Sequence, residues 1–251
     1  GDYDVTSELR IKRSSTELRA VTPGSVTIRY VGTAGRPIMV DAKNVVIDGV
    51  IVTGGNNPRD DGGGGIEVED DASLTLSRPT ITGNSDDLGG GILNEGTITV
   101  VDSTISNNTA SIKGGGLLNE GTATVTNSTF DGNTSFWGSA AASFSTINLN
   151  HTTIVRNVTT ASSTSYGALQ RLSGTFNVRS SIVGDNLRTN GSAARNCAGT
   201  VRLLDRNLLT STAGCTTSGT EIVKPLLVGA TANNGGPTPT AALLDGSPAI
   251  D

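Results

Sequence analysis

Residues able to bind a ligand recur at one place in the chain, just before successive glycine clusters. The early copies are acidic, the next is a lysine and the later ones are aromatic. Aromatic rings beside polar groups suit a sugar, because the ring face gives apolar contact and the polar neighbours fix its orientation. Polar loops with an aromatic cover over one coil would give the same pattern. The residues of this strip are Asp60, Asp61, Asp86, Asp87, Lys113, Phe136, Trp137 and Tyr166.

The two acidic pairs of the strip, Asp60-Asp61 and Asp86-Asp87, are candidates for a Ca²⁺ site. Hard cations bind several oxygens, and loop carboxylates one coil apart can converge. Adjacent carboxylates can equally point apart into water. We expect no other cofactor.

Catalysis on an anionic polysaccharide would need a base and cations near a uronate carboxyl. The candidates are Lys113, His151, Arg156 and Arg179, and their spacing does not bring them together. Acid pairs could also imitate the carboxylates of a glycoside hydrolase. The sequence therefore assigns no catalytic residue.

The elements that position these side chains belong to a repeat marked by five asparagines. Successive asparagines are 24, 25, 24 and 29 residues apart, and a fixed period of this size indicates stacked copies of one unit. The column predicts an internal ladder of stacked amides at an inward turn. Its members are Asn84, Asn108, Asn133, Asn157 and Asn186.

Each unit holds three short segments with alternating apolar residues, separated by Gly, Asn, Asp and Ser. Such alternation predicts strands with one buried face, and the separating residues predict turns. Three short strands per coil of about 25 residues describe an all-β parallel β-helix, a solenoid forming one domain. The chain lacks the leucine ladder of a leucine-rich repeat and the non-repeating hairpins of a β-sandwich.

Composition narrows the partners. The chain of 251 residues has 33 Gly, 3% aromatic residues and a formal net charge of −5. No basic stripe is present, so nucleic acid is not an expected partner. No apolar run approaches the length of a membrane span, so we expect no membrane insertion. A polysaccharide or cell-surface glycan is the expected partner.

Two cysteines, Cys197 and Cys215, lie outside the regular repeat in polar, turn-like sequence. We expect a disulfide, with a pair of free thiols as the alternative. A bonded pair in a chain rich in Ser, Thr and Asn favours an oxidising, extracellular or cell-surface location.

The chain divides into three stretches by regularity. Residues 1–44 are expected to form N-terminal coils and a cap, 45–186 the regular coils, and 187–251 irregular C-terminal coils and a closing segment with the cysteine loop. Incompletely capped ends leave strand edges free, which would allow self-association end to end.

Two motifs resemble a known family. G-G-G-I-L-N-E-G-T-I-T-V-V-D-S-T-I-S-N-N-T-A at 89–110 and N-N-G-G-P-T-P-T…L-L-D-G-S-P-A-I-D at 233–251 are similar to secreted bacterial right-handed β-helix proteins of the choice-of-anchor Q domain type. Members are often labelled probable pectate lyases. A more distant likeness is to the repeats of polymorphic outer-membrane proteins. The resemblance implies a right-handed helix and secretion or surface display, and it carries over no catalytic residue.

Two functions remain. The first is a structural, adhesive or carbohydrate-binding module without catalysis. The alternative is a polysaccharide lyase or glycoside hydrolase working at the strip.

Overall fold

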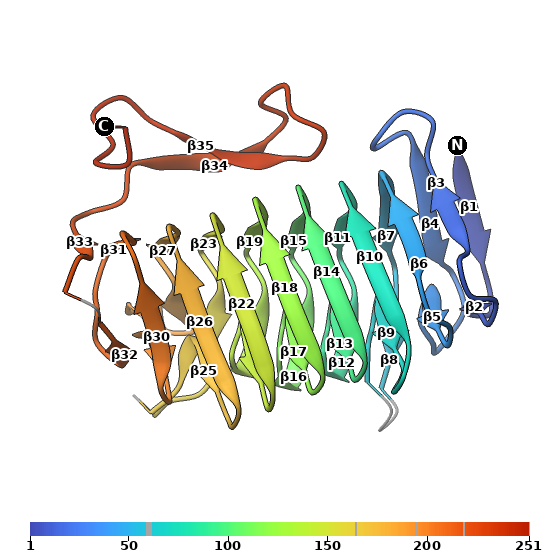
Figure 1. Ribbon diagram of the computed structural model, residues 1–251, viewed down its shortest axis with the longest axis horizontal. Coiled ribbons are helices and arrows are strands. Elements are labelled where there is room, and N and C mark those ends of the chain that lie inside the picture. Colours follow the sequence, from blue (N-terminus) through green and yellow to red (C-terminus); the bar gives the residue numbers. More distant parts are fainter. Residues whose placement is uncertain (59–61, 164, 194, 218, 251) are drawn as a thin grey trace.

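The chain folds into a parallel β-solenoid of about 8 turns, which confirms the predicted all-β architecture. The computed structural model describes residues 1–58, 62–163, 165–193, 195–217 and 219–250. Figure 1 shows the coils stacked side by side along the long axis. Over these residues every regular element is a strand, and no helix is long and apolar enough to cross a membrane.

Three long sheets form the sides of the solenoid. They correspond to the three segments predicted for each repeat, and each strand pairs in parallel with its counterpart one coil away. Sheet A runs β1 (Asp2–Val5), β4 (Val26–Tyr30), β7 (Val50–Thr53), β11 (Thr80–Thr82), β15 (Thr104–Ser106), β19 (Thr129–Asp131), β23 (Thr153–Val155), β27 (Ile182–Gly184), β31 (Leu208–Leu209) and β33 (Ile222–Val223). Sheet B runs β2 (Leu9–Ile11), β5 (Ile38–Val40), β9 (Ile66–Val68), β13 (Ile92–Asn94), β17 (Leu117–Asn119), β21 (Ala141–Ser143), β25 (Gly167–Arg171) and β29 (Arg195–Ala198). Sheet C runs β3 (Glu17–Arg19), β6 (Val45–Asp48), β10 (Ser73–Ser77), β14 (Thr97–Val101), β18 (Thr122–Thr126), β22 (Thr146–Asn150), β26 (Thr175–Arg179), β30 (Val201–Leu204) and β32 (Cys215–Thr216).

A fourth, shorter sheet lies where the sequence predicted only loops before the glycine clusters. Its strands pair in parallel from coil to coil, with shifts in register at two of the pairings. Strand β16, for example, exposes Thr109, Ser111 and Ile112 around the buried Ala110, so no regular apolar alternation marks these strands. Sheet D runs β8 (Asn56–Asn57), β12 (Ser85–Leu88), β16 (Thr109–Lys113), β20 (Thr134–Trp137), β24 (Val158–Thr159) and β28 (Leu187–Arg188).

Columns of aliphatic residues fill the interior. In sheet A, Ile105, Phe130 and Ile154 are in register and fully buried. The alternating residues of sheet C do the same, as with Ile98 and Ala123. A core of small layered side chains explains how a chain with 3% aromatics packs.

The predicted asparagine ladder is confirmed at the turn between sheets A and D. Each Nδ2 from Asn84 to Asn157 donates to the Oδ1 of the next asparagine at 3.0 Å. That Oδ1 also accepts the backbone N–H of the donor's own residue. The ladder thereby satisfies polar groups at a turn where every member is buried.

A second, shorter ladder joins sheets B and C and was not predicted. Asn94 Nδ2 donates to Asn119 Oδ1 at 2.7 Å, and Asn119 Nδ2 donates to the Ser143 hydroxyl at 3.1 Å. Val68 holds the matching position one coil earlier, so Asn94 Oδ1 has no partner among the described residues.

The C-terminal segment is more ordered than the irregular closing stretch that the sequence predicted. Strands β34 (Val228–Ala232) and β35 (Thr240–Leu243) form an antiparallel hairpin that runs back along one side of the solenoid (Figure 1). Arg156 Nη1 donates to the Gly229 carbonyl at 3.0 Å, and the Thr238 hydroxyl donates to the Asp102 carbonyl at 3.0 Å. These bonds fasten the hairpin across several coils.

The two cysteines form a disulfide between the last coils. Cys197 ends sheet B and Cys215 ends sheet C, with Cα atoms 4.9 Å apart. The bond ties β32, a strand of only two residues, to the longer strand β29.

Candidate functional site

The strip of charged and aromatic residues lies on sheet D and on the turns that lead from it into sheet B. Leu88, Lys113 and Trp137 occupy matching positions on β12, β16 and β20. Each strand then ends at a glycine with positive φ, as at Gly89 with φ 61°. A Cβ on Gly89 would lie 2.4 Å from the Ile92 carbonyl oxygen, so only glycine fits this tight turn into sheet B.

Three aromatic residues of the strip gather into one cluster. Trp137 stacks on Tyr166 with ring centroids 5.3 Å apart and an interplanar angle of 24°. Phe136 lies 5.9 Å from Trp137 and 5.7 Å from Tyr166. Phe136 is 39% exposed, and Trp137 and Tyr166 are half-buried. Trp137 is therefore on the outer surface and outside the core of the solenoid.

Lys113 extends over these rings and reaches a further aromatic residue. Its Nζ lies 5.4 Å from the Trp137 ring centroid and 4.9 Å from that of Phe144. Both distances are within the range of a cation–π interaction. Phe144, which is 36% exposed, was missed from the sequence because it follows the sheet B strand and not the glycine turn.

Phe144 could have been found from the residues that occupy the equivalent position in neighbouring coils. Its backbone N–H donates to Asn119 O, as the N–H of Glu120 donates to Asn94 O one coil earlier. The column therefore changes from glutamate to phenylalanine at the coil in which the strip changes from lysine to tryptophan. Two separate columns become aromatic together, which places four of the chain's eight aromatic residues on one surface.

A small apolar layer lies on the outward side of sheet B. Leu93, Leu118 and Ala142 are buried there and packed together with Leu88 and Leu172. The outward side of sheet B is therefore covered at the coils that carry the strip.

Only half of the candidate Ca²⁺ site at the acidic end of the strip can be described, and the site stays a prediction. Asp60 and Asp61 lie outside the described residues. Asp86 is buried, and its Oδ1 accepts the backbone N–H groups of Asp87 and Leu88 at 2.5 and 3.3 Å. Asp87 accepts a hydrogen bond from the Ser111 hydroxyl. Asp86 and Asp87 thus point to different partners.

Burial gives Asp86 an unusual proton affinity. Desolvation raises its pKa from 3.8 to about 6, against the opposing effect of the backbone N–H groups, Asn57 and Arg36. Its Oδ2 has no hydrogen-bond partner among the described residues. This side chain is poised to change charge in mildly acidic solution.

Another acidic group lies on the outward side of sheet B and was not singled out from the sequence. Oxygen atoms of Glu67, Glu69 and Glu95 lie within 4.8 Å of one another and could hold a cation. Glu67 is buried and ion-paired with Arg36. Desolvation, with the charges of Asp70, Glu120 and Glu69, raises the pKa of Glu95. The sequence signal for this group is a glutamate directly after successive sheet B strands, namely Glu69 after β9, Glu95 after β13 and Glu120 after β17.

The other three candidates for catalysis, His151, Arg156 and Arg179, lie apart from Lys113 and the strip. His151 occupies a turn with φ 52° between sheets C and A, in the position of Asp102 and Asn127. Arg156 forms a two-pronged pair with Asp131, with both N–O distances 2.8 Å. Arg179 lies on sheet C and pairs with Asp205.

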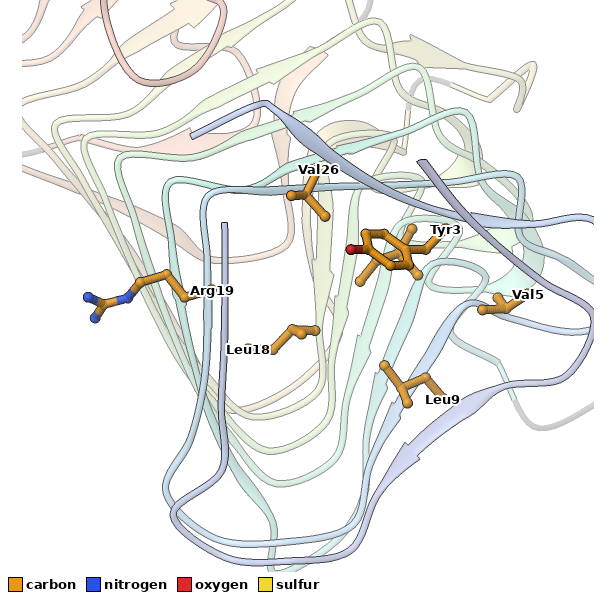
Figure 2. A pocket seen from close by; sticks show the side chains of 7 residues that line it. Tyr3, Val5, Leu9, Leu18, Arg19 and Val26 are labelled. Atoms are coloured by element: carbon orange, nitrogen blue, oxygen red, sulfur yellow. The ribbon is translucent and has the colours of Figure 1, made fainter. Parts of the chain in front are cut away.

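The N-terminal end of the solenoid carries a separate apolar hollow of about 320 Å³. Figure 2 shows Tyr3, Leu9, Leu18 and Val26 directed into the space enclosed by the first coil, with Arg19 directed away from it. Strands β1, β2 and β3 are the first described strands of sheets A, B and C. The N-terminal cap expected within residues 1–44 stays a prediction.

Comparisons with known proteins leave the solenoid without a named relative. No family model, no curated protein and no solved structure matches the chain. The likeness to choice-of-anchor Q domain proteins therefore rests on the sequence motifs alone, while the β-solenoid fold itself is confirmed.

Proposed function

We propose that this protein is a glycan-binding β-solenoid that works outside the cell or at its surface. The observation that carries the proposal is the cluster of Phe136, Trp137, Phe144 and Tyr166 on one outer face, with Lys113 lying over two of its rings. Partly exposed rings that pack against one another offer stacking surfaces for sugars at low entropic cost.

The indole N–H of Trp137 adds a second argument. It has no hydrogen-bond acceptor among the described residues. A covered donor without a partner costs free energy, and such groups are rare in folded proteins unless they serve a ligand or a change of state. A hydroxyl oxygen of a bound sugar, reached by a small rotation of the neighbouring rings, would satisfy it.

The ligand chemistry follows from the charges around the rings. Lys113 is the cation of the strip, while Asp87 lies half-buried one coil away. A densely anionic polysaccharide would bring its carboxylates close to Asp87 and to the acidic group of Glu67, Glu69 and Glu95. The proposed ligand is therefore a neutral or weakly charged glycan. The rigid coils would act as a spacer that presents the strip.

The single tryptophan supplies the assay. Titration of the protein with neutral and acidic oligosaccharides, chosen from a glycan array, should change the fluorescence of Trp137. Trp137→Ala should weaken binding several-fold, since stacking contributes about 1–2 kcal/mol beyond burial. The melting temperature should hardly change, because Trp137 lies outside the core.

Tyr3→Ala is the matched control, because Tyr3 is an aromatic residue 62% exposed and lies on β1, several coils from the strand that carries Trp137. Its affinity for the glycan should equal that of the wild type. Equal affinities for Trp137→Ala and the wild type, measured by calorimetry, would defeat the proposal. Release of unsaturated sugars from an anionic polysaccharide would instead support the lyase alternative.

A further inference from the structure

Two buried polar atoms without partners lie on neighbouring coils at the aromatic cluster. The indole Nε1 of Trp137, on β20, is a donor without an acceptor, and the Oε1 of Gln170, on β25, is an acceptor without a donor among the described residues. The exposed fraction of Gln170 is 6%. Buried polar groups are nearly always hydrogen-bonded, because an unpaired one costs free energy. An unpaired donor and an unpaired acceptor at one surface therefore call for a common partner.

Tyr166 stands where the preceding coil has a turn glycine. Gly138 precedes Ala142 by four residues, and Tyr166 precedes Gln170 by four, while Ala142 and Gln170 are paired between β21 and β25. A Cβ on Gly138 would lie 2.8 Å from the Ala142 Cβ. This turn position is therefore next to the outward residue of sheet B. In the coil of Tyr166 that residue is Gln170.

Trp137 reaches the same place from the coil before. It directly precedes Gly138, and its ring stacks on Tyr166 with centroids 5.3 Å apart. The indole thus spans the step between the two coils, and the Tyr166 ring connects it with the position of Gln170. The unpaired donor and the unpaired acceptor belong to one surface for this reason.

We propose that Trp137 Nε1 and Gln170 Oε1 together bind one polar group of the glycan, an inference that rests on the proposed function of this surface. An indole N–H only donates, and an amide oxygen only accepts. A group that satisfies both must itself accept and donate a hydrogen bond. Carboxylates only accept and ammonium groups only donate, so neither fits. The pair selects a neutral sugar group, either a hydroxyl or the amide of an N-acetylated sugar.

Both atoms are covered in the ligand-free protein, so binding must move a ring. Phe136 is 39% exposed, more than the half-buried Trp137 and Tyr166, and it packs at a tilt on both of them. Outward rotation of Phe136 therefore loses the least buried surface of the three. A sugar ring stacked in its place would keep the apolar contact and bring a polar group to the pair.

The test removes the acceptor and the ligand group in turn. Gln170→Met keeps the length of the side chain and removes its amide. Trp137 fluorescence measures binding of cellotriose, mannotriose and chitotriose, and then of monodeoxy and O-methyl forms of each sugar that binds. In the wild type, loss or methylation of the bound hydroxyl should weaken binding about tenfold. Gln170→Met should bind the parent sugar about tenfold more weakly and lose nothing further with the analogue.

The source of the polar group is read from the same panel. If chitotriose binds, its deacetylated form should bind at least tenfold more weakly where the amide is the bound group, because an ammonium cannot accept. If every deoxy, O-methyl and deacetylated form binds the wild type as tightly as its parent, the inference is overturned. This arm uses the wild type alone, so it holds even if Gln170→Met fails to fold in thermal unfolding.

The control variant is Asn148→Ala, on the outer face of sheet C, which should bind every sugar as the wild type does. Weaker binding by Trp137→Ala with unchanged binding by Gln170→Met would overturn the role of Gln170 and leave the proposed function standing. An equal loss with the analogue in Gln170→Met and in the wild type would overturn it too. Absence of binding by the wild type to every sugar of the panel and the array would defeat the proposed function and this inference together.

Discussion

Replacing Asn133 by alanine tests how much the buried ladder contributes to stability. Asn133 is fully buried and its side chain makes four hydrogen bonds. Its Nδ2 donates to Asn157 Oδ1 at 3.0 Å and to the Ile105 carbonyl at 2.8 Å. Its Oδ1 accepts the backbone N–H and the Nδ2 of Asn108, at 3.1 and 3.0 Å.

The hydrogen-bond partners of Asn133 are affected to different degrees by its removal. Asn108 Nδ2 keeps the Ile81 carbonyl, and Asn157 Oδ1 keeps the backbone N–H of residue 133. The backbone N–H of Asn108 is left without its acceptor in a buried site, which costs about 1–3 kcal/mol. Adding the bonds whose partners remain satisfied, we expect Asn133→Ala to lower the free energy of unfolding by about 2–4 kcal/mol.

Urea unfolding followed by far-ultraviolet circular dichroism and by Trp137 fluorescence measures this change, and coincident transitions show that one process is observed. Asn148→Ala is the control. Asn148 is half-buried on the outer face of sheet C and accepts one bond from Asn177 Nδ2 at 2.8 Å. It should cost less than about 1 kcal/mol. If both variants lose the same amount, the buried ladder is not a special source of stability.

Three further changes probe separate parts of the chain. Folding raises the pKa of Asp86 from 3.8 to about 6, so the stability contributed by its neutral form is present below pH 4 and lost as pH rises towards 6. At pH 7 the free energy of unfolding of Asp86→Asn should therefore exceed that of the wild type by about 2–3 kcal/mol. A difference that does not shrink at pH 4 would contradict this. Cys215→Ser removes the disulfide with Cys197 and should lower the free energy of unfolding in urea by about 3 kcal/mol. Reduction of the wild type should have the same effect, and a reduced wild type as stable as the oxidised one would contradict the prediction. Arg156→Ala should increase hydrogen exchange in the C-terminal hairpin and leave the ladder protected, whereas unchanged exchange in the hairpin would show that Arg156 does not fasten it.

The coils were predictable because each repeated residue serves the same contact in every copy. Asn108 and Asn133 fill equivalent places in one ladder, so their spacing shows both the period and the buried turn. The second ladder was missed because Asn94 and Asn119 are followed one coil later by Ser143, whose hydroxyl accepts the hydrogen bond in place of an amide oxygen. The hydrogen bond is kept although the residue type changes.

The strip was predictable in position and less so in form. Matching distances from the glycine turns correctly brought Lys113 next to Trp137. The strands of sheet D were missed because they are short and show no regular apolar alternation, as in β16. Phe144 was missed because it lies after the sheet B strand, whereas Lys113 lies before a glycine turn. Only the folded coils bring these two positions together on one face. The hairpin was missed for a similar reason, because its contacts with residues near Asp102 span 136 positions of sequence.

Departures from the repeat are the best guide to function in a solenoid. The glycine turn recurs at Gly114 and Gly138, but the cluster that follows it changes from glycines to Ser139 and Ala140. At that coil Trp137 appears on sheet D, and Phe144 appears where glutamates stood before. The matching outward residue of sheet B changes from Leu118 to Ala142 at the same coil. The surface chemistry thus changes while the backbone is preserved, and this departure from the repeat supports the proposal of a ligand-binding surface.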